Sequence, residues 1–116
     1  MNARLDHVAL TVANREASAA FYARYFDLTQ RVHDDDHLLI VANAAGSLLA
    51  LSDGAPVTDL PRTTHFGFQL ETARDVEALR ARFAAGGIEE AEWQPGGPTR
   101  IQVFDPDGYR VEAYAF

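Results

Sequence analysis

Asp6-His-Val-Ala-Leu-Thr-Val12 is the stretch that decides the fold, because the chain repeats its pattern as Thr64-His-Phe-Gly-Phe-Gln-Leu70. The two stretches lie 58 residues apart, which is half of the 116-residue chain. The same shift places Phe21 over Leu79. Two units of this length are too few for a solenoid, so the sequence indicates one module present twice.

Each copy of the stretch alternates between two kinds of residue, as a half-buried β-strand does. Polar or small residues take one face, and apolar residues take the other, namely Val8, Leu10 and Val12 in the first copy and Phe66, Phe68 and Leu70 in the second. The apolar face of each strand is therefore expected to meet a helix.

The helices are expected to follow these strands directly. Asn14 can cap a helix that runs to about Asp27, because its short side chain accepts a hydrogen bond from the first turn. Thr72 with Asp75 three residues later resembles a capping box, and Gly86-Gly87 ends the second helix. Each module therefore contains one amphipathic helix.

Three shorter strands are expected after each helix, separated by turn residues. They are placed near Thr29–Val32, Leu38–Val41 and Leu48–Ser52 in the first half, and near Glu89–Gln94, Arg100–Phe104 and Arg110–Ala115 in the second. The fold class predicted is α+β, with two βαβββ modules forming a curved mixed sheet that carries its helices on the convex face. We expect a single domain over 1–116, with module 1 at about 1–54, a linker at about 55–62 and module 2 at about 63–116.

Composition narrows the classes of partner. The chain has 10 Arg, no Lys, 17 acidic residues and no Cys, with a formal net charge of −7. This excludes thiol and Schiff-base chemistry, and it argues against binding to nucleic acid or to an anionic membrane, which would need a basic patch. No run approaches the ~20 apolar residues of a membrane span. We expect a cytoplasmic protein with a small-molecule substrate or ligand.

The strand face opposite the helices carries polar side chains, which makes them candidates for a functional site. They are His7, His65, Gln69, Arg100, Gln102, Glu112 and Tyr114. Two imidazoles and a carboxylate suit a divalent transition metal such as Fe, Mn, Ni or Zn. The repeat places His7 and His65 at equivalent positions. A histidine on a strand is also often a hydrogen-bonded structural residue, so the pattern by itself leaves both interpretations open.

Three residues are candidates for substrate binding. Arg100 and Gln102 could grip a carboxylate or carbonyl of the substrate, or Arg100 could form an ion pair with Glu112 or Asp107. Tyr114 lies two residues from Glu112, where its hydroxyl could act as an acid or orient the substrate, or its ring could pack loosely at the surface. The run His33-Asp-Asp-Asp-His37 is interpreted as a solvated acidic loop rather than as a second metal site.

Several stretches resemble one known group of proteins. They are Leu5-Asp-His-Val-Ala-Leu-Thr-Val12, Phe21-Tyr22, Thr64-His-Phe-Gly-Phe68 and Phe104-Asp-Pro-Asp-Gly-Tyr-Arg-Val-Glu-Ala-Tyr114. Together they resemble the glyoxalase, bleomycin-resistance and extradiol-dioxygenase group, the vicinal oxygen chelate superfamily. The resemblance covers the whole chain and implies paired βαβββ modules around a metal and substrate site.

The resemblance also implies a ligand set. His7 matches the ligand on the first strand, His65 its equivalent in the second module, and Glu112 the carboxylate of the last strand. The fourth position, a Glu in glyoxalase I, falls on Ala50, which cannot bind a metal. Two His and one Glu resemble the three-ligand set of the extradiol dioxygenases, which leaves positions open for a chelating substrate and dioxygen.

The function implied is that of a metal-dependent lyase, isomerase or dioxygenase acting on a molecule that chelates the ion through neighbouring oxygens. The alternative is a metal-free binding protein of the bleomycin-resistance type. No catalytic residue is assigned. A homodimer is expected, because small members of this group pair or exchange modules between chains, and its interface is expected at strand edges and around 56–61.

Overall fold

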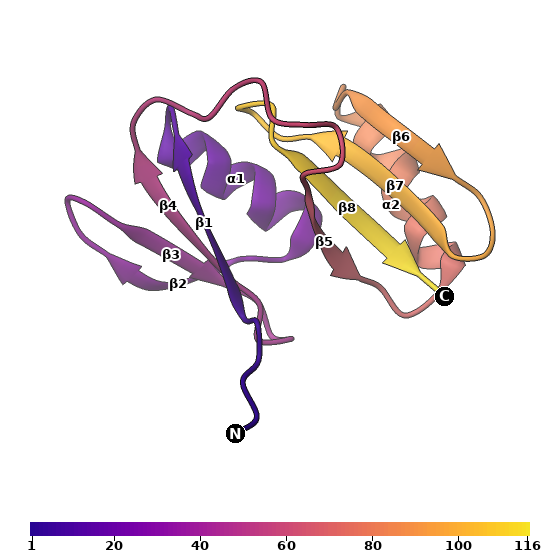
Figure 1. Ribbon diagram of the computed structural model, residues 1–116, viewed down its shortest axis with the longest axis horizontal. Helices are drawn as coiled ribbons and strands as arrows, with labels where there is room; N and C mark the ends of the chain where they lie inside the picture. Colours follow the sequence, from indigo (N-terminus) through magenta and orange to yellow (C-terminus); the bar gives the residue numbers. More distant parts are fainter. The chain divides into compact units, whose positions relative to one another are not determined.

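The computed structural model describes residues 1–116 and divides them into two compact units, Met1–Val57 (unit 1) and Thr58–Phe116 (unit 2) (Figure 1). Unit 1 contains β1 (His7–Val12), α1 (Arg15–Phe26), β2 (Gln30–Asp34), β3 (Leu39–Ala42) and β4 (Leu48–Asp53). Unit 2 contains β5 (Phe66–Gln69), α2 (Ala73–Ala85), β6 (Glu90–Gln94), β7 (Thr99–Phe104) and β8 (Arg110–Ala115). Both predicted βαβββ modules are confirmed, and the class is α+β.

Each unit contains one four-stranded mixed sheet. The strand order is β1-β4-β3-β2 in unit 1 and β5-β8-β7-β6 in unit 2. In both sheets the first strand pairs in parallel with the last, and the other pairings are antiparallel. The strand that begins each module and the strand that ends it are therefore neighbours, which is how residues far apart in sequence meet in unit 2.

Both predicted helix caps are confirmed. The Asn14 side chain accepts a hydrogen bond from the Ala17 amide at 3.1 Å. Thr72 and Asp75 form a reciprocal capping box, with bonds of 3.1 and 3.2 Å between side chain and backbone. These caps satisfy amide groups that the first helical turn would otherwise leave unpaired.

One helix covers one face of each sheet (Figure 1), and the core lies between them. The fully buried apolar side chains there include Tyr22, Leu39 and Leu51 in unit 1 and Val76, Val103 and Val111 in unit 2. Burial of apolar surface supplies the main stabilisation of such a layer. The opposite face of each sheet, called here the open face, carries the polar side chains considered below.

Both units have an irregularity at the same place. The ladder shifts between Arg31 and His33 in β2, and between Glu90 and Glu92 in β6. The prediction that β2 ends near Val32 was wrong, because His33 and Asp34 continue the pairing with β3 beyond this bulge. Neither α1 nor α2 has the length and apolar character that a membrane-spanning helix requires.

Candidate metal centre

Four residues form a row across the open face of unit 2. The register places Gly67 of β5 beside Glu112 of β8, Glu112 beside Gln102 of β7, and Gln102 beside Glu92 of β6. A second row lies two residues away along each strand and contains Gln69, Tyr114, Arg100 and Gln94. The alternation expected from the sequence therefore places Arg100, Gln102, Glu112 and Tyr114 on one face.

His65 stands directly before β5 with one ring nitrogen occupied. Its Nδ1 lies 2.9 Å from the carbonyl oxygen of Thr63. A carbonyl oxygen only accepts, so Nδ1 carries the proton of the neutral ring and Nε2 keeps its lone pair. That Nε2 lies 3.8 Å from Oε2 of Glu112.

Glu112 is held through its other oxygen. Oε1 accepts hydrogen bonds from Gln102 Nε2 at 3.1 Å and from Arg100 Nη1 at 3.4 Å. The carboxylate is largely buried, with 12% of its side chain exposed. Oε2 is thus the oxygen that faces the imidazole of His65.

This pair fits a metal ion by the chemistry of its donor atoms. In the neutral ring a lone pair on Nε2 faces a carboxylate oxygen, so two acceptors face each other and a cation between them is favourable. The distance of 3.8 Å between them is too long for an N–H···O hydrogen bond. Two atoms each bound to one ion at about 2.1 Å can lie up to about 4.2 Å apart, which this spacing satisfies.

His7 lies in unit 1 at the start of β1, with the same nitrogen occupied as in His65. Its Nδ1 lies 2.9 Å from Oδ1 of Asp6, and this hydrogen bond holds the pKa of Asp6 below its usual value. A carboxylate on one ring nitrogen is a common way to orient a metal-binding imidazole through the other. Neither unit by itself contains three or more His, Asp or Glu side chains grouped as metal ligands.

Ala50 occupies the position in unit 1 that Glu112 occupies in unit 2. Ala50 pairs with Ala9 across the parallel β1–β4 ladder, as Glu112 pairs with Gly67 across β5–β8. The next strand then places Ile40 beside Ala50, where unit 2 has Gln102 beside Glu112. The open face of unit 1 therefore has no carboxylate in this row of β1, β4 and β3.

The candidate substrate-binding residues differ in their surroundings. Arg100 forms ion pairs through Nη1 with Glu92 at 2.6 Å and with Glu112 at 3.4 Å. Gln102 is almost fully buried, and both ends of its amide are hydrogen-bonded. Tyr114 is half-buried and packs edge-to-face against Phe116, with ring centres 5.7 Å apart.

Glu92 is a residue of this face that sequence reasoning missed. It joins Arg100 to Arg62, whose Nη2 lies 2.6 Å from Oε1 of Glu92. The two guanidinium groups, Arg100 foremost, lower the pKa of this carboxyl. The bulge before Glu92 hid the signal, because it changes which face the following residues take.

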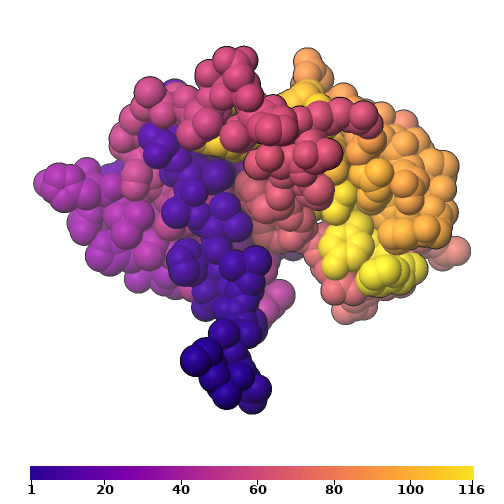
Figure 2. All heavy atoms as spheres, in the orientation of Figure 1, coloured from indigo at the N-terminus to yellow at the C-terminus, as the bar shows by residue number.

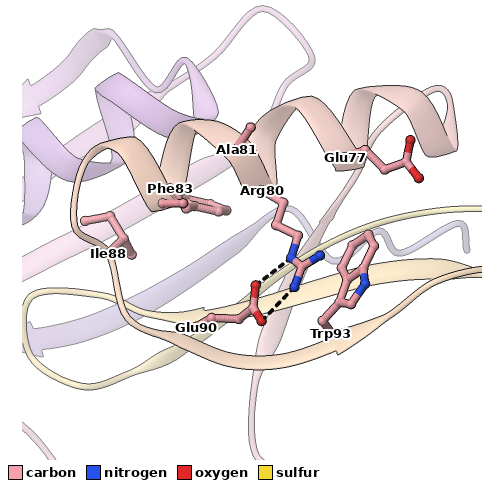
Figure 3. A pocket seen from close by; sticks show the side chains of 8 residues that line it. Glu77, Arg80, Ala81, Phe83, Ile88, Glu90 and Trp93 are labelled. Carbon is pink, nitrogen blue, oxygen red and sulfur yellow. Dashed lines mark hydrogen bonds and ion pairs between the residues drawn. The ribbon is translucent and has the colours of Figure 1, made fainter.

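A cavity of about 480 Å³ lies on the other face of the same sheet, between α2 and β6 (Figure 3). Arg80 crosses it, with its guanidinium 4.3 Å from the ring centre of Trp93 and Nε 2.7 Å from Glu90. Trp93 lines this cavity. The charge of Arg80 is compensated by Glu90, and its guanidinium lies over Trp93, so this cavity is not a candidate metal centre.

Comparison with known proteins agrees with this architecture. A family model described as the Glyoxalase/Bleomycin resistance protein/Dioxygenase superfamily matches residues 4–113. No match is found among curated proteins. A possible glyoxalase from Bacillus cereus is similar in structure, with 26% identity, coverage of 95% of this chain and 96% of that chain, and a TM-score of 0.79.

Two further solved structures share the fold at lower identity. The fosfomycin resistance protein FosX from Listeria monocytogenes, solved with Mn(II) and a sulfate ion, is 20% identical, with coverage of 100% and 94% and a TM-score of 0.83. Lactoylglutathione lyase from Agrobacterium tumefaciens is 24% identical, with coverage of 98% and 94% and a TM-score of 0.77. The family match spans nearly the whole chain and confirms the resemblance noted from the sequence. This chain therefore belongs to the Glyoxalase/Bleomycin resistance protein/Dioxygenase superfamily.

Proposed function

We propose that this protein is a metal-dependent enzyme that acts on a small molecule able to chelate a divalent ion through neighbouring oxygens. The proposed protein ligands are His7, His65 and Glu112. The observation that carries the proposal is the approach of His65 Nε2 to Glu112 Oε2, at 3.8 Å, with Nδ1 of the same ring already bonded to Thr63. The manganese found in the FosX structure supports a divalent ion as the cofactor.

A bound divalent ion would act as a Lewis acid that polarises the coordinated substrate oxygens. The protein's own part would be to present the three donor atoms. Asp6 and Thr63 hold Nδ1 of the two imidazoles, so Nε2 of each ring is the nitrogen left to bind the ion. Since only three protein ligands are proposed, positions are left for the substrate.

Arg100 and Tyr114 are the side chains proposed to meet the substrate beside the ion. They are cross-strand neighbours on the open face, adjacent to the row that contains Glu112. Arg100 can attract an anionic group, although Glu92 and Glu112 already compensate much of its charge. The hydroxyl of Tyr114 is proposed to orient a substrate oxygen or to donate a proton to it.

The first test is metal content. The protein is purified without chelator and its metal is measured by plasma mass spectrometry, with Glu112→Gln treated in the same way as the matched variant. We expect about one divalent ion per chain in the natural protein and little metal in Glu112→Gln. Equal metal content in both, or none in either after incubation with Mn²⁺, Fe²⁺, Ni²⁺ and Zn²⁺, would reject the proposal.

The second test concerns the type of reaction. Glyoxalase chemistry uses two carboxylates, and the position of the second is Ala50. We therefore expect little or no lactoylglutathione from methylglyoxal and glutathione with nickel or zinc. Efficient formation of that product would overturn the interpretation of Ala50.

A homodimer is also proposed. Each sheet has two edge strands within its unit, β1 and β2 in unit 1 and β5 and β6 in unit 2. Large apolar side chains are exposed at both termini, with Leu5 91% and Phe116 86% exposed, and Figure 2 shows the N-terminal residues projecting from unit 1. Open edges and exposed apolar residues favour association. Light scattering that gives 12.7 kDa at micromolar concentration would contradict it.

A second candidate function is metal-free binding of a small molecule. The observation that favours it is the apolar row of unit 1, in which Ala9, Ala50 and Ile40 stand where unit 2 has Gly67, Glu112 and Gln102. A protein of this kind would bind its ligand equally well after removal of metal. Ligand binding measured with and without chelator separates the two functions.

A further inference from the structure

We infer that Gln102 is a positioning residue, which fixes the Glu112 carboxylate for metal binding and is itself oriented by Arg110. The sequence suggested that Gln102 contacts the substrate. The structure favours the other role, because Gln102 is only 3% exposed and its amide is bonded at both ends. The inference rests on the proposed function, since it concerns the same metal centre.

The orientation of the amide follows from its two neighbours. Arg110 Nη1 lies 3.3 Å from Oε1 of Gln102, and Nε2 of Gln102 lies 3.1 Å from Oε1 of Glu112. A guanidinium only donates and a carboxylate only accepts, so the reverse orientation would bring donor against donor and acceptor against acceptor. Arg110 and Glu112 therefore both favour the orientation in which the NH₂ end of Gln102 faces Glu112.

Arg110 is itself held in place. Its guanidinium lies over the ring of Phe104, 5.1 Å from the ring centre, and Phe104 is its cross-strand neighbour on β7. No bond joins Arg110 directly to Glu112. Its influence on the carboxylate is therefore expected to pass through the amide of Gln102.

The two carboxylate oxygens of Glu112 therefore have different roles. Oε1 is occupied by Gln102 and Arg100, which leaves Oε2 directed toward His65. Gly67 provides the space for this, since a Cβ at that position would lie 3.2 Å from Cβ and 3.4 Å from Oε2 of Glu112. A hydrogen bond from a neighbouring residue to a ligating carboxylate changes metal affinity by about 10- to 100-fold.

The test compares Mn²⁺ dissociation constants, measured by calorimetry on the metal alone, for the natural protein, Gln102→Met and Gln69→Met. Met has a similar length but cannot bond to Glu112. Gln69 is the matched control, because it lies on the same open face, beside Tyr114, and takes no part in the bonds that hold Glu112. We expect Mn²⁺ binding about 10- to 100-fold weaker in Gln102→Met and unchanged in Gln69→Met. Unchanged binding in both would overturn the inference and leave the proposed function intact.

Arg110→Met gives a second test, because a pure charge effect and the proposed positioning effect predict opposite changes in Mn²⁺ affinity. Removal of a positive charge near a cation site should strengthen Mn²⁺ binding if Arg110 acts only by its charge. The inference predicts weaker binding, because the amide loses one of the two partners that hold it and is less firmly fixed against Glu112. In the Gln102→Met background this weakening should vanish, and an equal weakening there would overturn the inference. Arg110 is half-buried, so Arg110→Met can still be measured if Gln102→Met does not fold.

A metal-free measurement separates the inference from the proposed function. If the natural protein binds no metal, the proposed function fails. The bridge from Arg110 through the Gln102 amide to Glu112 can then still be tested by nitrogen NMR. If the bridge exists, the side-chain NH₂ signals of Gln102 should shift in both Arg110→Met and Glu112→Gln. Signals that are insensitive to both substitutions would show that the amide bridges neither residue.

Discussion

The two units share a backbone plan but differ in the chemistry of their open faces. Both begin with a histidine whose Nδ1 is bonded to a nearby oxygen, Asp6 for His7 and Thr63 for His65. Both have a bulge at the same place in their second strand. The difference begins at the last strand, which carries Glu112 in unit 2 and Ala50 at the equivalent place in unit 1.

This difference extends to the neighbours of the two residues. Glu112 lies beside Gln102, whereas Ala50 lies beside Ile40. A buried carboxylate needs hydrogen-bond donors, and unit 2 supplies Gln102 and Arg100 for this purpose. Without a carboxylate, unit 1 needs no such donors and uses an apolar residue. The comparison teaches that the carboxylate of unit 2 is accompanied by the donors that hold it, whereas unit 1 has neither.

The largest expected effect comes from removing one of the three proposed ligands. His65→Ala, Glu112→Gln and His7→Ala should each weaken Mn²⁺ binding by more than about 100-fold, because loss of a ligand costs more than loss of its supporting bond. Calorimetry checks this, with Gln69→Ala on the same face as the control. If His7→Ala binds as the natural protein does, unit 1 contributes no ligand and the equivalence of the two histidines fails.

The next effect is that of pH on metal binding. Metal ligation requires neutral imidazoles, so protons compete with the metal for both histidines and metal affinity should fall as the pH is lowered from 7.5 to 5. The dissociation constant is measured across this range in the natural protein and in His7→Ala. The variant should show a shallower dependence. Binding that is independent of pH would exclude both histidines as ligands.

A smaller effect is expected from restoring the missing carboxylate. Ala50→Glu should tighten metal binding by about tenfold, because it adds a donor at the position equivalent to Glu112. Adding Ile40→Gln should tighten it further, since this supplies the amide that unit 2 provides through Gln102. Ile40→Gln alone is the control. An Ala50→Glu protein with unchanged affinity would show that this position does not face the ion.

The smallest effect concerns the loop between β2 and β3. The backbone amide of His37, the side chain of His33 and the backbone amide of Leu38 lower the pKa of Asp35 from its usual 3.8 to about 2. Its stabilising contribution is therefore present above about pH 4 and is lost as the pH falls through 2. Asp35→Asn should lower Tm slightly at pH 7, and the difference from the natural protein should shrink toward pH 2.

Asp36→Asn is the matched control for that measurement, because Asp36 is the next residue of the same loop and takes no part in these bonds. Its Tm should follow that of the natural protein at every pH. The corresponding loop of unit 2, between β6 and β7, uses Gly96 and Gly97 in place of the aspartates. A pH-dependent Tm difference as large in Asp36→Asn would show that general charge, and not the bonds of Asp35, stabilises the loop.

The sequence was sufficient to predict the helices and strands, and to predict which face most strand residues take. Alternation with a period of two is a local property of an extended backbone, so it correctly placed Glu112, Gln102 and Arg100 on one face. The caps at Asn14 and Thr72 are equally local, because each side chain bonds to an amide three residues away. These features need no knowledge of the rest of the chain.

The choice of partners was decided by the tertiary structure. The bulge in β6 turns Glu90 toward Arg80 of α2 and Glu92 toward Arg100, although strict alternation would place both carboxylates on one face. The orientation of the Gln102 amide likewise depends on Arg110 and Glu112 of another strand. A side chain's face follows from its own backbone, whereas its partner depends on the register between strands. The sequence therefore determined most of the polar residues that share the open face of unit 2, with Glu92 beyond the bulge as the exception, and only the folded sheet decided which of them bond to one another.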